Sequence, residues 1–194
     1  EKEFFSALDD DISNAPNAAA RKRMIIELEH ANSKLYQLFC RALFTSEASS
    51  KFIRNSGLYP LTGRGDINTY SIFSEQFKKF TNSKGRSGFI VPTGIATDDT
   101  NKFFFAELVR DNQLISLFDF ENRKKIFQNV HSRYKFSLLT IGPTKAARKT
   151  IFGFFLHDIL DLQDHQRIFS LTKEDFLNIN PNTKTTPIFR TRYD

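Results

Sequence analysis

Cysteine is nearly absent from this sequence, which contains only Cys40, and tryptophan is absent altogether. A single cysteine excludes a disulfide framework and any cysteine-rich zinc module, and it favours a reducing, cytoplasmic location. No apolar run approaches the roughly 20 residues that a membrane-spanning helix needs. The first residues do not resemble a signal peptide. We therefore expect a protein without a membrane segment.

Motifs typical of hydrolytic or metal chemistry are also missing. The four histidines are scattered and form no HExxH pattern, so we expect no metal site. No GxSxG nucleophile elbow occurs. Asp119 and Glu121 are spaced as in some nucleases, but Arg123 stands where such a set usually has lysine. We expect these two carboxylates to line a cleft or to form a salt bridge at a strand end.

Phenylalanine and basic charge are what the sequence has in quantity. Its 194 residues include 22 phenylalanines, and 28 Lys and Arg against 22 Asp and Glu give a net charge of +6. The length is typical of one domain with a substantial core. The basic surplus favours a polyanionic partner, although a solvated surface rich in Lys and Arg would give the same charge.

The first part of the chain, residues 1–57, is predicted to be helical. Apolar residues recur there at helical spacing and are expected to share one face: Leu35, Leu38, Phe39, Ala42 and Leu43. Proline and glycine mark a loop near residues 59–66. We expect the second part of the chain to be residues 58–194.

Helices and strands are predicted to alternate in this second part. Asp66 is expected to cap a helix that contains Tyr70, and further helices are expected after residues 98–100 and from Thr172. Strands are predicted from short apolar runs at 88–92, 114–120, 134–141 and 150–156. This alternation is typical of an α/β fold with a mostly parallel sheet, and the two late strands predict an antiparallel edge.

Ligands of open α/β sheets bind beyond the carboxyl ends of the strands. The segments predicted to lie there are 92–99 and 119–123. The loop 123–133 follows and combines several Lys and Arg residues with Phe127, a mixture that suits phosphate contact and base stacking. A solvated basic loop with Phe127 packed into the core is the simpler alternative.

Two longer blocks of sequence resemble a known family. The first is Asn68-Thr69-Tyr70 with GRSGFIVPTGIATD at 85–98, and the second is FDFENR at 118–123 with Ile126-Phe127 and KFSLLT at 135–140. Together they resemble the second half of the catalytic domain of DNA adenine-N6 methyltransferases, of the large single-chain restriction-modification or phage-defence type. The segments EKEFF at 1–5, APN at 15–17 and NPNTKTTPIFR at 180–190 are similar to the same subfamily.

The resemblance implies a partial Rossmann-like methyltransferase sheet that is mixed, with an antiparallel last strand, and that follows the N-terminal helical segment. It also implies S-adenosylmethionine as cofactor and double-stranded DNA as substrate, with the adenine flipped out of the duplex to reach the methyl donor. The family's glycine-rich donor motif and its Asn/Asp-Pro-Pro-aromatic catalytic motif do not occur in this sequence. We therefore expect the downstream half of a catalytic domain, with the upstream half of the same polypeptide as its partner, and no activity from this half alone.

The resemblance also assigns candidate binding residues. Asp66, Asn68 and Tyr70 match the helix start that lies near the donor's adenosine, although helix capping and core packing would explain them equally well. The floor of the adenine pocket is assigned to the strand-end motif Pro92, Thr93 and Gly94. No residue of this chain is assigned to catalysis.

Contact with DNA is assigned to the basic loop. Phe127 matches the aromatic residue that stacks on the flipped adenine. Contacts to the DNA backbone are assigned to Arg123, Lys124, Lys125 and Arg133, with Lys184, Arg190 and Arg192 in the tail as weaker candidates of the same kind.

Two other functions remain open at this point. The chain can be a non-catalytic nucleic-acid-binding or assembly module that shares this half-fold, or an ordinary structural domain that binds neither donor nor DNA. An exposed sheet edge would also allow a homo-oligomer.

Overall fold

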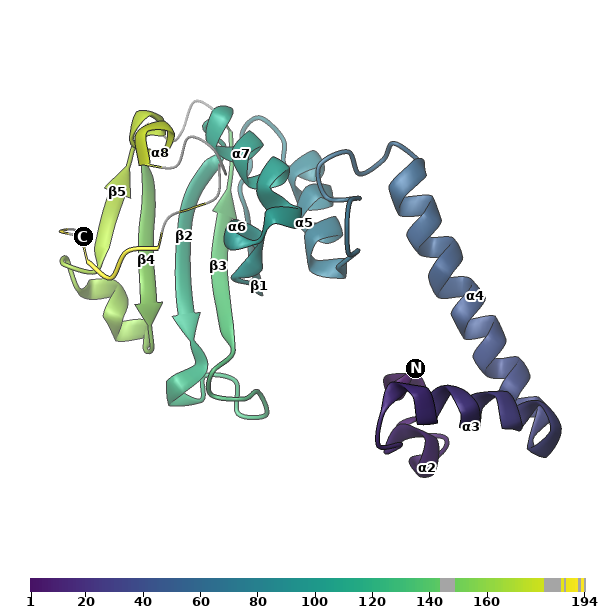
Figure 1. Cartoon of the computed structure of the whole chain (residues 1–194). Coiled ribbons are helices and arrows are strands. Elements are labelled where there is room, and N and C mark those ends of the chain that lie inside the picture. Colours follow the sequence, from purple (N-terminus) through teal and green to yellow (C-terminus); the bar gives the residue numbers. More distant parts are fainter. Residues whose placement is uncertain (144–148, 180–185, 187, 192, 194) are drawn as a thin grey trace. The chain divides into compact units, whose positions relative to one another are not determined.

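The structure is a computed structural model, and it describes residues 1–143, 149–179, 186, 188–191 and 193. The chain forms two compact units, Glu1–Ser56 and Gly57–Asp194 (Figure 1). No helix among the described residues is long and apolar enough to cross a membrane.

The first unit is built from four helices, α1 (Lys2–Phe5), α2 (Asp10–Ser13), α3 (Ala18–Ala31) and α4 (Ser33–Asn55). Helices α2, α3 and α4 each begin after an N-cap residue whose side chain accepts a hydrogen bond from a backbone N–H of the first turn. These residues are Asp9, Asn17 and Asn32. Their core consists of Phe5, Ile12, Ile25, Leu28, Leu35 and Phe39.

The apolar face predicted on α4 is only partly buried. Leu35 and Phe39 lie in the core, whereas Leu38 is 52% exposed and Leu43 is 44% exposed. The described helices of this unit are too short to cover all of α4, which is 23 residues long. The predicted helix is confirmed, and its apolar face is only partly buried within this unit.

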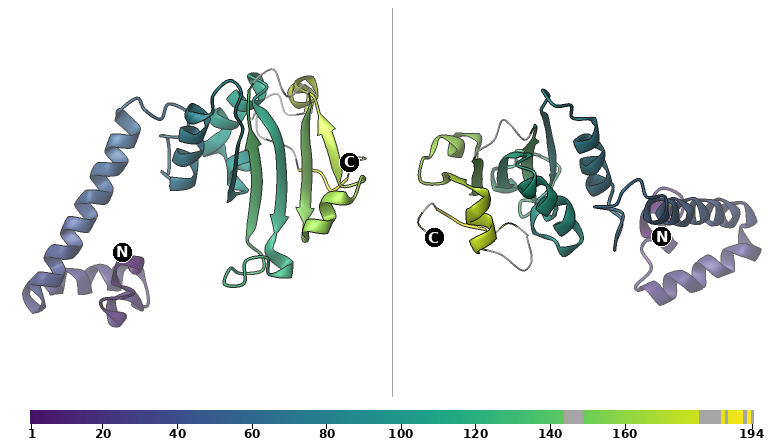
Figure 2. Two further views of the ribbon diagram at one scale, coloured as in Figure 1. Left: turned by 180° about the vertical axis from the view of Figure 1, so that it is seen from behind. Right: turned by 90° about the horizontal axis from the view of Figure 1, so that it is seen from above.

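The second unit is an α/β structure with a five-stranded open mixed sheet in the order β1-β3-β2-β4-β5. Figure 2 shows the same strands from behind, with the loop between β2 and β3 at one end of the sheet. The strands are β1 (Ser87–Pro92), β2 (Leu114–Glu121), β3 (Lys135–Ile141), β4 (Thr150–Leu156) and β5 (Ile168–Leu171). The helices are α5 (Thr69–Phe80), α6 (Gly94–Thr97), η1 (Asp99–Asn101), α7 (Lys102–Arg110), η2 (Asn122–Lys124), η3 (Ile159–Gln163) and α8 (Lys173–Ile179).

The sheet is not mostly parallel, so that prediction was wrong. Strand β3 pairs antiparallel with both β1 and β2, β5 pairs antiparallel with β4, and only β2 and β4 pair in parallel among the described strands. The strands at 134–141 and 150–156 were predicted to form a pair, but β2 lies between them. Both edge strands, β1 and β5, pair antiparallel with their neighbours, and β5 is a four-residue strand that the sequence analysis missed.

The core of the second unit lies on one face of the sheet. Alternate strand residues Val91, Leu117, Leu139 and Phe152 point into it, because strand side chains alternate between the two faces. Helices α6, α7 and α8 cover them with Ile95, Ala96, Phe104, Phe105, Leu108 and Phe176. On the opposite face Ile90 is 56% exposed and Ile151 is 43% exposed.

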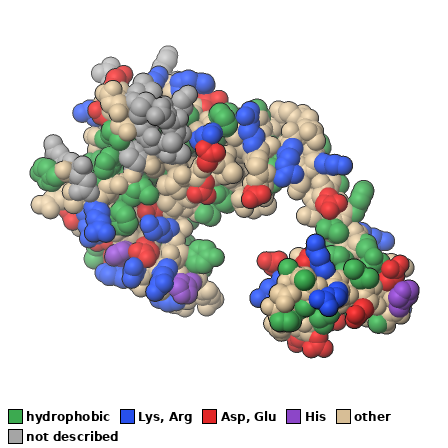
Figure 3. Space-filling model, in the orientation of Figure 1, with side chains coloured by type: hydrophobic (Ala, Val, Ile, Leu, Met, Phe, Trp, Pro, Cys, Tyr) green, Lys and Arg blue, Asp and Glu red, His purple; other side chains and the backbone are tan. Residues whose placement is uncertain are grey.

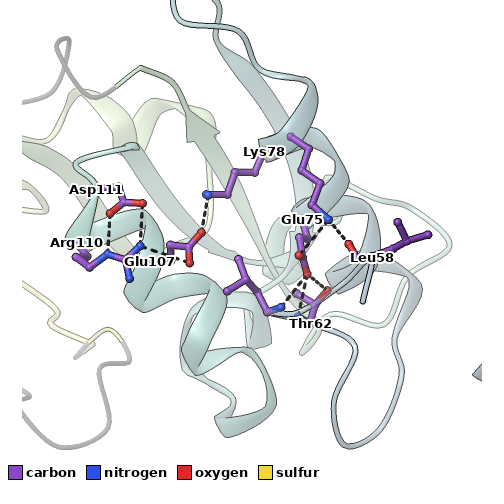
Figure 4. A network of polar contacts seen from close by, with 9 residues as sticks. Leu58, Thr62, Glu75, Lys78, Glu107, Arg110 and Asp111 are labelled. Carbon is purple, nitrogen blue, oxygen red and sulfur yellow. Dashed lines mark hydrogen bonds and ion pairs between the residues drawn. The ribbon is translucent and has the colours of Figure 1, made fainter. Parts of the chain in front are cut away.

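A buried carboxylate fastens the loop before α5 to that helix. Glu75 is 1% exposed, and its Oε2 accepts hydrogen bonds from the amides of Leu61 (3.2 Å) and Thr62 (3.0 Å) and from the Thr62 hydroxyl (2.8 Å) (Figure 4). Lys78 on α5 forms an ion pair with Glu107 on α7 at 2.7 Å. These contacts hold α5 in place. They also hold its first residues, which the resemblance assigned to binding of the methyl donor.

Replacing Glu75 with alanine should weaken this loop strongly. Glu75→Ala leaves two amides and a hydroxyl without their acceptor, which costs about 2–4 kcal/mol. Hydrogen exchange should show faster exchange of the Leu61 and Thr62 amides. The control is Glu107→Ala, which removes ion pairs to Lys78 and Arg110 but leaves the Leu61 and Thr62 amides with their acceptor, so these amides should exchange as in the wild type. Equal effects of the two variants would contradict the role given to Glu75.

Candidate nucleic-acid interface

The carboxyl ends of three strands lie at the same end of the sheet. Strands β1 and β2 both run antiparallel to β3, and β4 runs parallel to β2, so all three share one direction. Their last residues are Pro92, Glu121 and Leu156. The candidate residues after β1 and β2 are therefore brought to the end of the sheet where ligands bind in open α/β folds.

Asp119 connects these strand ends from inside the protein. It is fully buried, and its Oδ1 accepts a hydrogen bond from the hydroxyl of Thr93, just after β1. The Ser137 hydroxyl on β3 lies 3.4 Å from the Thr93 hydroxyl and 3.5 Å from Asp119 Oδ1. Oδ2 of Asp119 makes no hydrogen bond to the described residues. Thr93 therefore serves here as a buried structural partner of Asp119.

Burial raises the pKa of Asp119 above its ordinary value. The hydroxyls of Thr93 and Ser137, the charge of Lys135 and the nearby backbone amide of Phe155 oppose this effect, but they do not cancel it. The raised pKa follows from moving a carboxylate into a medium that solvates its charge poorly.

Tyr70 and Gly94 are brought together by a residue that the sequence analysis did not select, Asn101. The Nδ2 of Asn101 donates to the Tyr70 hydroxyl (3.2 Å) and to the Gly94 carbonyl (3.0 Å). A Cβ on Gly94 would come within 2.2 Å of Asp98 Oδ2 and 3.0 Å of the Tyr70 hydroxyl. Glycine is needed at position 94 because this chain's own side chains approach the backbone there.

Asp66 and Asn68 lie apart from this contact and are exposed. Asn68 is the N-cap residue of α5 but makes no side-chain bond to the helix, and Asp66 lies two residues earlier, so the predicted cap at Asp66 is wrong. Tyr70 is half-buried and its hydroxyl is already bonded to Asn101, so only Asp66 and Asn68 of these three candidates have exposed polar groups.

Asn122 organises the loop after β2. It is fully buried, and its Nδ2 donates to the carbonyls of Phe127 and Val130, both at 2.9 Å. Its Oδ1 accepts the Phe127 amide at 2.9 Å, and its own amide donates to the Tyr134 carbonyl at 2.9 Å. One asparagine thus satisfies the backbone of a loop that has no strand or helix around Phe127. A buried amide immediately after a strand was the available signal, and the sequence analysis missed it.

Phe127 is held at the surface by this loop. Its side chain is 38% exposed, and its ring lies edge-on to Phe136 with 4.9 Å between centroids. Phe136 in turn stacks on the buried Phe120 at 5.4 Å. The alternatives of base stacking and core packing are therefore both open to it, because one part of the ring packs inward and another part faces solvent.

The four basic residues of the loop are all exposed, but two of them already have acidic partners. Arg123 Nε lies 3.0 Å from Glu121 Oε1, and Lys124 Nζ lies 3.0 Å from Asp158 Oδ2. Lys125 Nζ donates to the Val130 carbonyl at 3.2 Å, from a left-handed backbone conformation. The Arg133 guanidinium makes no bond to any described residue.

These cations lie near histidines at the same end of the sheet. Figure 3 shows Lys, Arg and His side chains gathered there. His157 Nε2 is 3.6 Å from Glu121 Oε2, so Glu121 faces both His157 and Arg123. Arg123 in particular lowers the pKa of Glu121. The expectation of a salt bridge at this strand end is confirmed for Glu121. For Asp119 the expectation of a cleft or salt bridge is wrong, because this side chain is fully buried and bonded to Thr93.

The tail candidates are only partly covered by the structure. Lys184 and Arg192 lie outside the described residues. Arg190 is exposed, and its guanidinium carbon lies 5.4 Å from the centre of the Phe155 ring. Thr186 donates its amide to the Ala96 carbonyl at 3.0 Å, so this part of the tail runs close to the segment after β1.

Comparisons with models of protein families and with curated proteins found no match for this sequence. Among the residues that the structure describes, no group of three or more His, Cys, Asp or Glu side chains is placed to hold a metal ion.

Asn122→Ala should loosen the loop that presents Phe127. The variant loses three side-chain hydrogen bonds to the backbone, and we expect a loss of about 1–3 kcal/mol in local stability. Hydrogen exchange at the Phe127 amide measures it. Asn129→Ala, at an exposed position of the same loop, should leave that exchange rate unchanged, and a loop equally protected in both variants would contradict this role for Asn122.

Asp119→Asn should change how stability depends on pH. An acid with a raised pKa in the folded state contributes stability that is full below its unfolded pKa, about 3.9, and is lost as the pH rises through the folded value. Asparagine does not titrate. The free energy of unfolding of the variant minus that of the wild type should thus be more positive at about pH 7 than at about pH 4.

Urea unfolding at a series of pH values gives this difference. Carboxyls with a lowered pKa, such as Glu121 and Asp158, lose their contribution as the pH falls, and they do so equally in both proteins. They therefore cancel in the comparison. A difference that stays constant with pH would show that Asp119 does not titrate above its unfolded value.

Proposed function

We propose that this chain is part of an S-adenosylmethionine-dependent DNA adenine-N6 methyltransferase of a restriction-modification or related system. In this proposal it supplies part of the sheet, part of the adenine pocket and contacts to the DNA backbone. The residues that carry out the chemistry belong to the upstream half of the same polypeptide. The cellular location that we propose is the cytoplasm.

The observation that carries the proposal is the loop held by Asn122. It lies at the carboxyl end of β2 and presents a partly exposed aromatic ring, Phe127, beside four exposed cations. A flipped base needs an aromatic surface for stacking, and its strand needs cations for the phosphates. A loop with its backbone bonds already satisfied can offer both without a large ordering cost on binding.

The sheet also agrees with the proposed family. Strand β3 runs antiparallel to its neighbours β1 and β2, which share one direction, and β5 gives the sheet an antiparallel last strand. A partial Rossmann-like sheet would have such a mixture of directions. Pro92, Thr93 and Gly94 then lie at the strand end that would form the pocket floor, where Thr93 is held by Asp119.

S-adenosylmethionine would supply the methyl group. Asp66 and Asn68 are the described residues that would hold polar groups of its adenosine, and Tyr70 would shape the wall beside them. The donor motif rich in glycine is not in this sequence, so we expect weak donor binding by this chain on its own.

A non-catalytic nucleic-acid-binding module is the second candidate. The contact between Tyr70 and Asn101, together with Asp98 over Gly94, closes the space at the end of β1 with the chain's own side chains. That arrangement favours DNA contact without a donor site. Binding of DNA with a steep salt dependence and no binding of donor would support it.

Phe127→Ala tests the proposed stacking. The probe is a duplex in which one adenine stands opposite an abasic site, so that flipping costs little. We expect affinity for this duplex to fall about fivefold or more, because stacking contributes about 1–3 kcal/mol per base. Fluorescence anisotropy of the labelled duplex gives the affinity. Ile126→Ala, which removes a side chain of almost equal exposure from the same loop, is the control.

The outcomes separate the candidates. Loss of affinity in Phe127→Ala alone supports the adenine pocket, whereas equal weakening by both variants indicates a general apolar contact. No DNA binding by the wild type would overturn both candidates. Transfer of a tritiated methyl group to DNA by this chain alone would overturn the assignment of catalysis to the upstream half.

A further inference from the structure

Phe155 has an unusual backbone conformation at the carboxyl end of β4. Its φ is 55°, in the left-handed region that bulky residues rarely adopt. It lies at a bulge, because the pairing of β2 with β4 shifts between Phe118–Gly153 and Phe120–Leu156. Bulges re-aim side chains and are frequent near functional sites.

Two cations lie over the ring that this bulge presents. Lys135 Nζ is 4.7 Å from the ring centre, and the guanidinium carbon of Arg190 is 5.4 Å from it. The ring itself is half-buried and Arg190 is exposed. A base that stacks on this half-buried ring must replace one of the two cations over it, and both cations remain close enough to offer positive charge to its phosphate.

The buried Asp119 lies directly behind the bulge. It is the residue of β2 that stands between the two shifted pairs, and its carboxylate lies near the Phe155 backbone amide. Asp119 is therefore a positioning residue for this turn of the backbone. The same carboxylate is bonded to Thr93, so the Phe155 site shares its support with the strand end after β1.

We propose that Phe155, Lys135 and Arg190 form a second nucleotide-binding position, which takes an unstacked base of a DNA strand and its phosphate. Lys135 is the first residue of β3, and strand alternation turns its side chain to the face opposite Phe136, against which Phe127 packs, so this position is separate from the Phe127 surface. This inference rests on the proposed DNA-binding function. It adds a contact for a flanking nucleotide to the contact with the target base.

The test is Phe155→Leu, which keeps an apolar side chain at the bulge and removes the aromatic ring. The probe is a short single-stranded oligonucleotide that carries 2-aminopurine and a fluorescein label. We expect its affinity to fall about fivefold or more and the change in 2-aminopurine fluorescence to be lost. Phe155→Tyr should bind as the wild type does, since it keeps the ring. Ile151→Ala, at an exposed position of the same strand, is the matched control.

Charge is tested separately with Arg190→Gln. Loss of one phosphate contact to a single strand should reduce the slope of log affinity against log salt by about 0.7. Circular dichroism and thermal unfolding of each variant identify any loss of folding, and Phe155→Tyr provides the folded comparison for the bulge.

The results distinguish this inference from the function on which it rests. If the wild type binds DNA and Phe127→Ala weakens that binding while Phe155→Leu binds as the wild type does, the second position is wrong and the proposed function stands. If the wild type binds neither the duplex nor the oligonucleotide, both the proposed function and the second position are wrong. Selective loss in Phe155→Leu, restored in Phe155→Tyr, supports the second position.

Discussion

A buried carboxylate, that of Asp119, determines how the strand ends of the second unit fit together. It is bonded to Thr93 after β1, lies beside Ser137 on β3, and faces the bulge of β4. A buried charge must be satisfied by protein groups, so the strands that supply those groups have one acceptable register. A slip of one residue would turn Asp119 to the opposite face. The position of Asn122, three residues later, depends on the same register.

Local sequence predicted where strands lie in this unit but not how they pair. The runs around Phe89, Leu117, Leu139 and Phe152 are apolar enough to be recognised as strands without knowledge of their neighbours. The insertion of β3 between β1 and β2 depends on contacts between residues far apart in the chain, which no local pattern records. Strand β5 was missed because four residues, none of them fully buried and one of them polar, give too short a pattern.

For the candidate residues too, the sequence predicted their positions along the strands but not the residues that they contact. Their sequence blocks placed Thr93, Gly94 and Phe127 at or near strand ends, where the structure has them. Their partners come from distant segments: Asp119 for Thr93, Asn101 for Tyr70 and Phe136 for Phe127. A residue type indicates what a side chain can bind. Which groups it binds in the folded chain is decided by the sheet.

The acidic partners of the loop cations change how the basic surplus can act on DNA. A phosphate that binds Arg123 must replace Glu121. The binding free energy gained is therefore only the difference between the Arg123–phosphate contact and the Arg123–Glu121 contact that is lost. Glu121 retains His157 at 3.6 Å, which makes that exchange easier. Arg133 has no internal bond to give up among the described residues. Long-range attraction therefore falls mainly to Arg133 and Lys125, which have no acidic partner among the described residues. Arg123 and Lys124 contribute mainly to a strand that fits closely enough to displace their carboxylates.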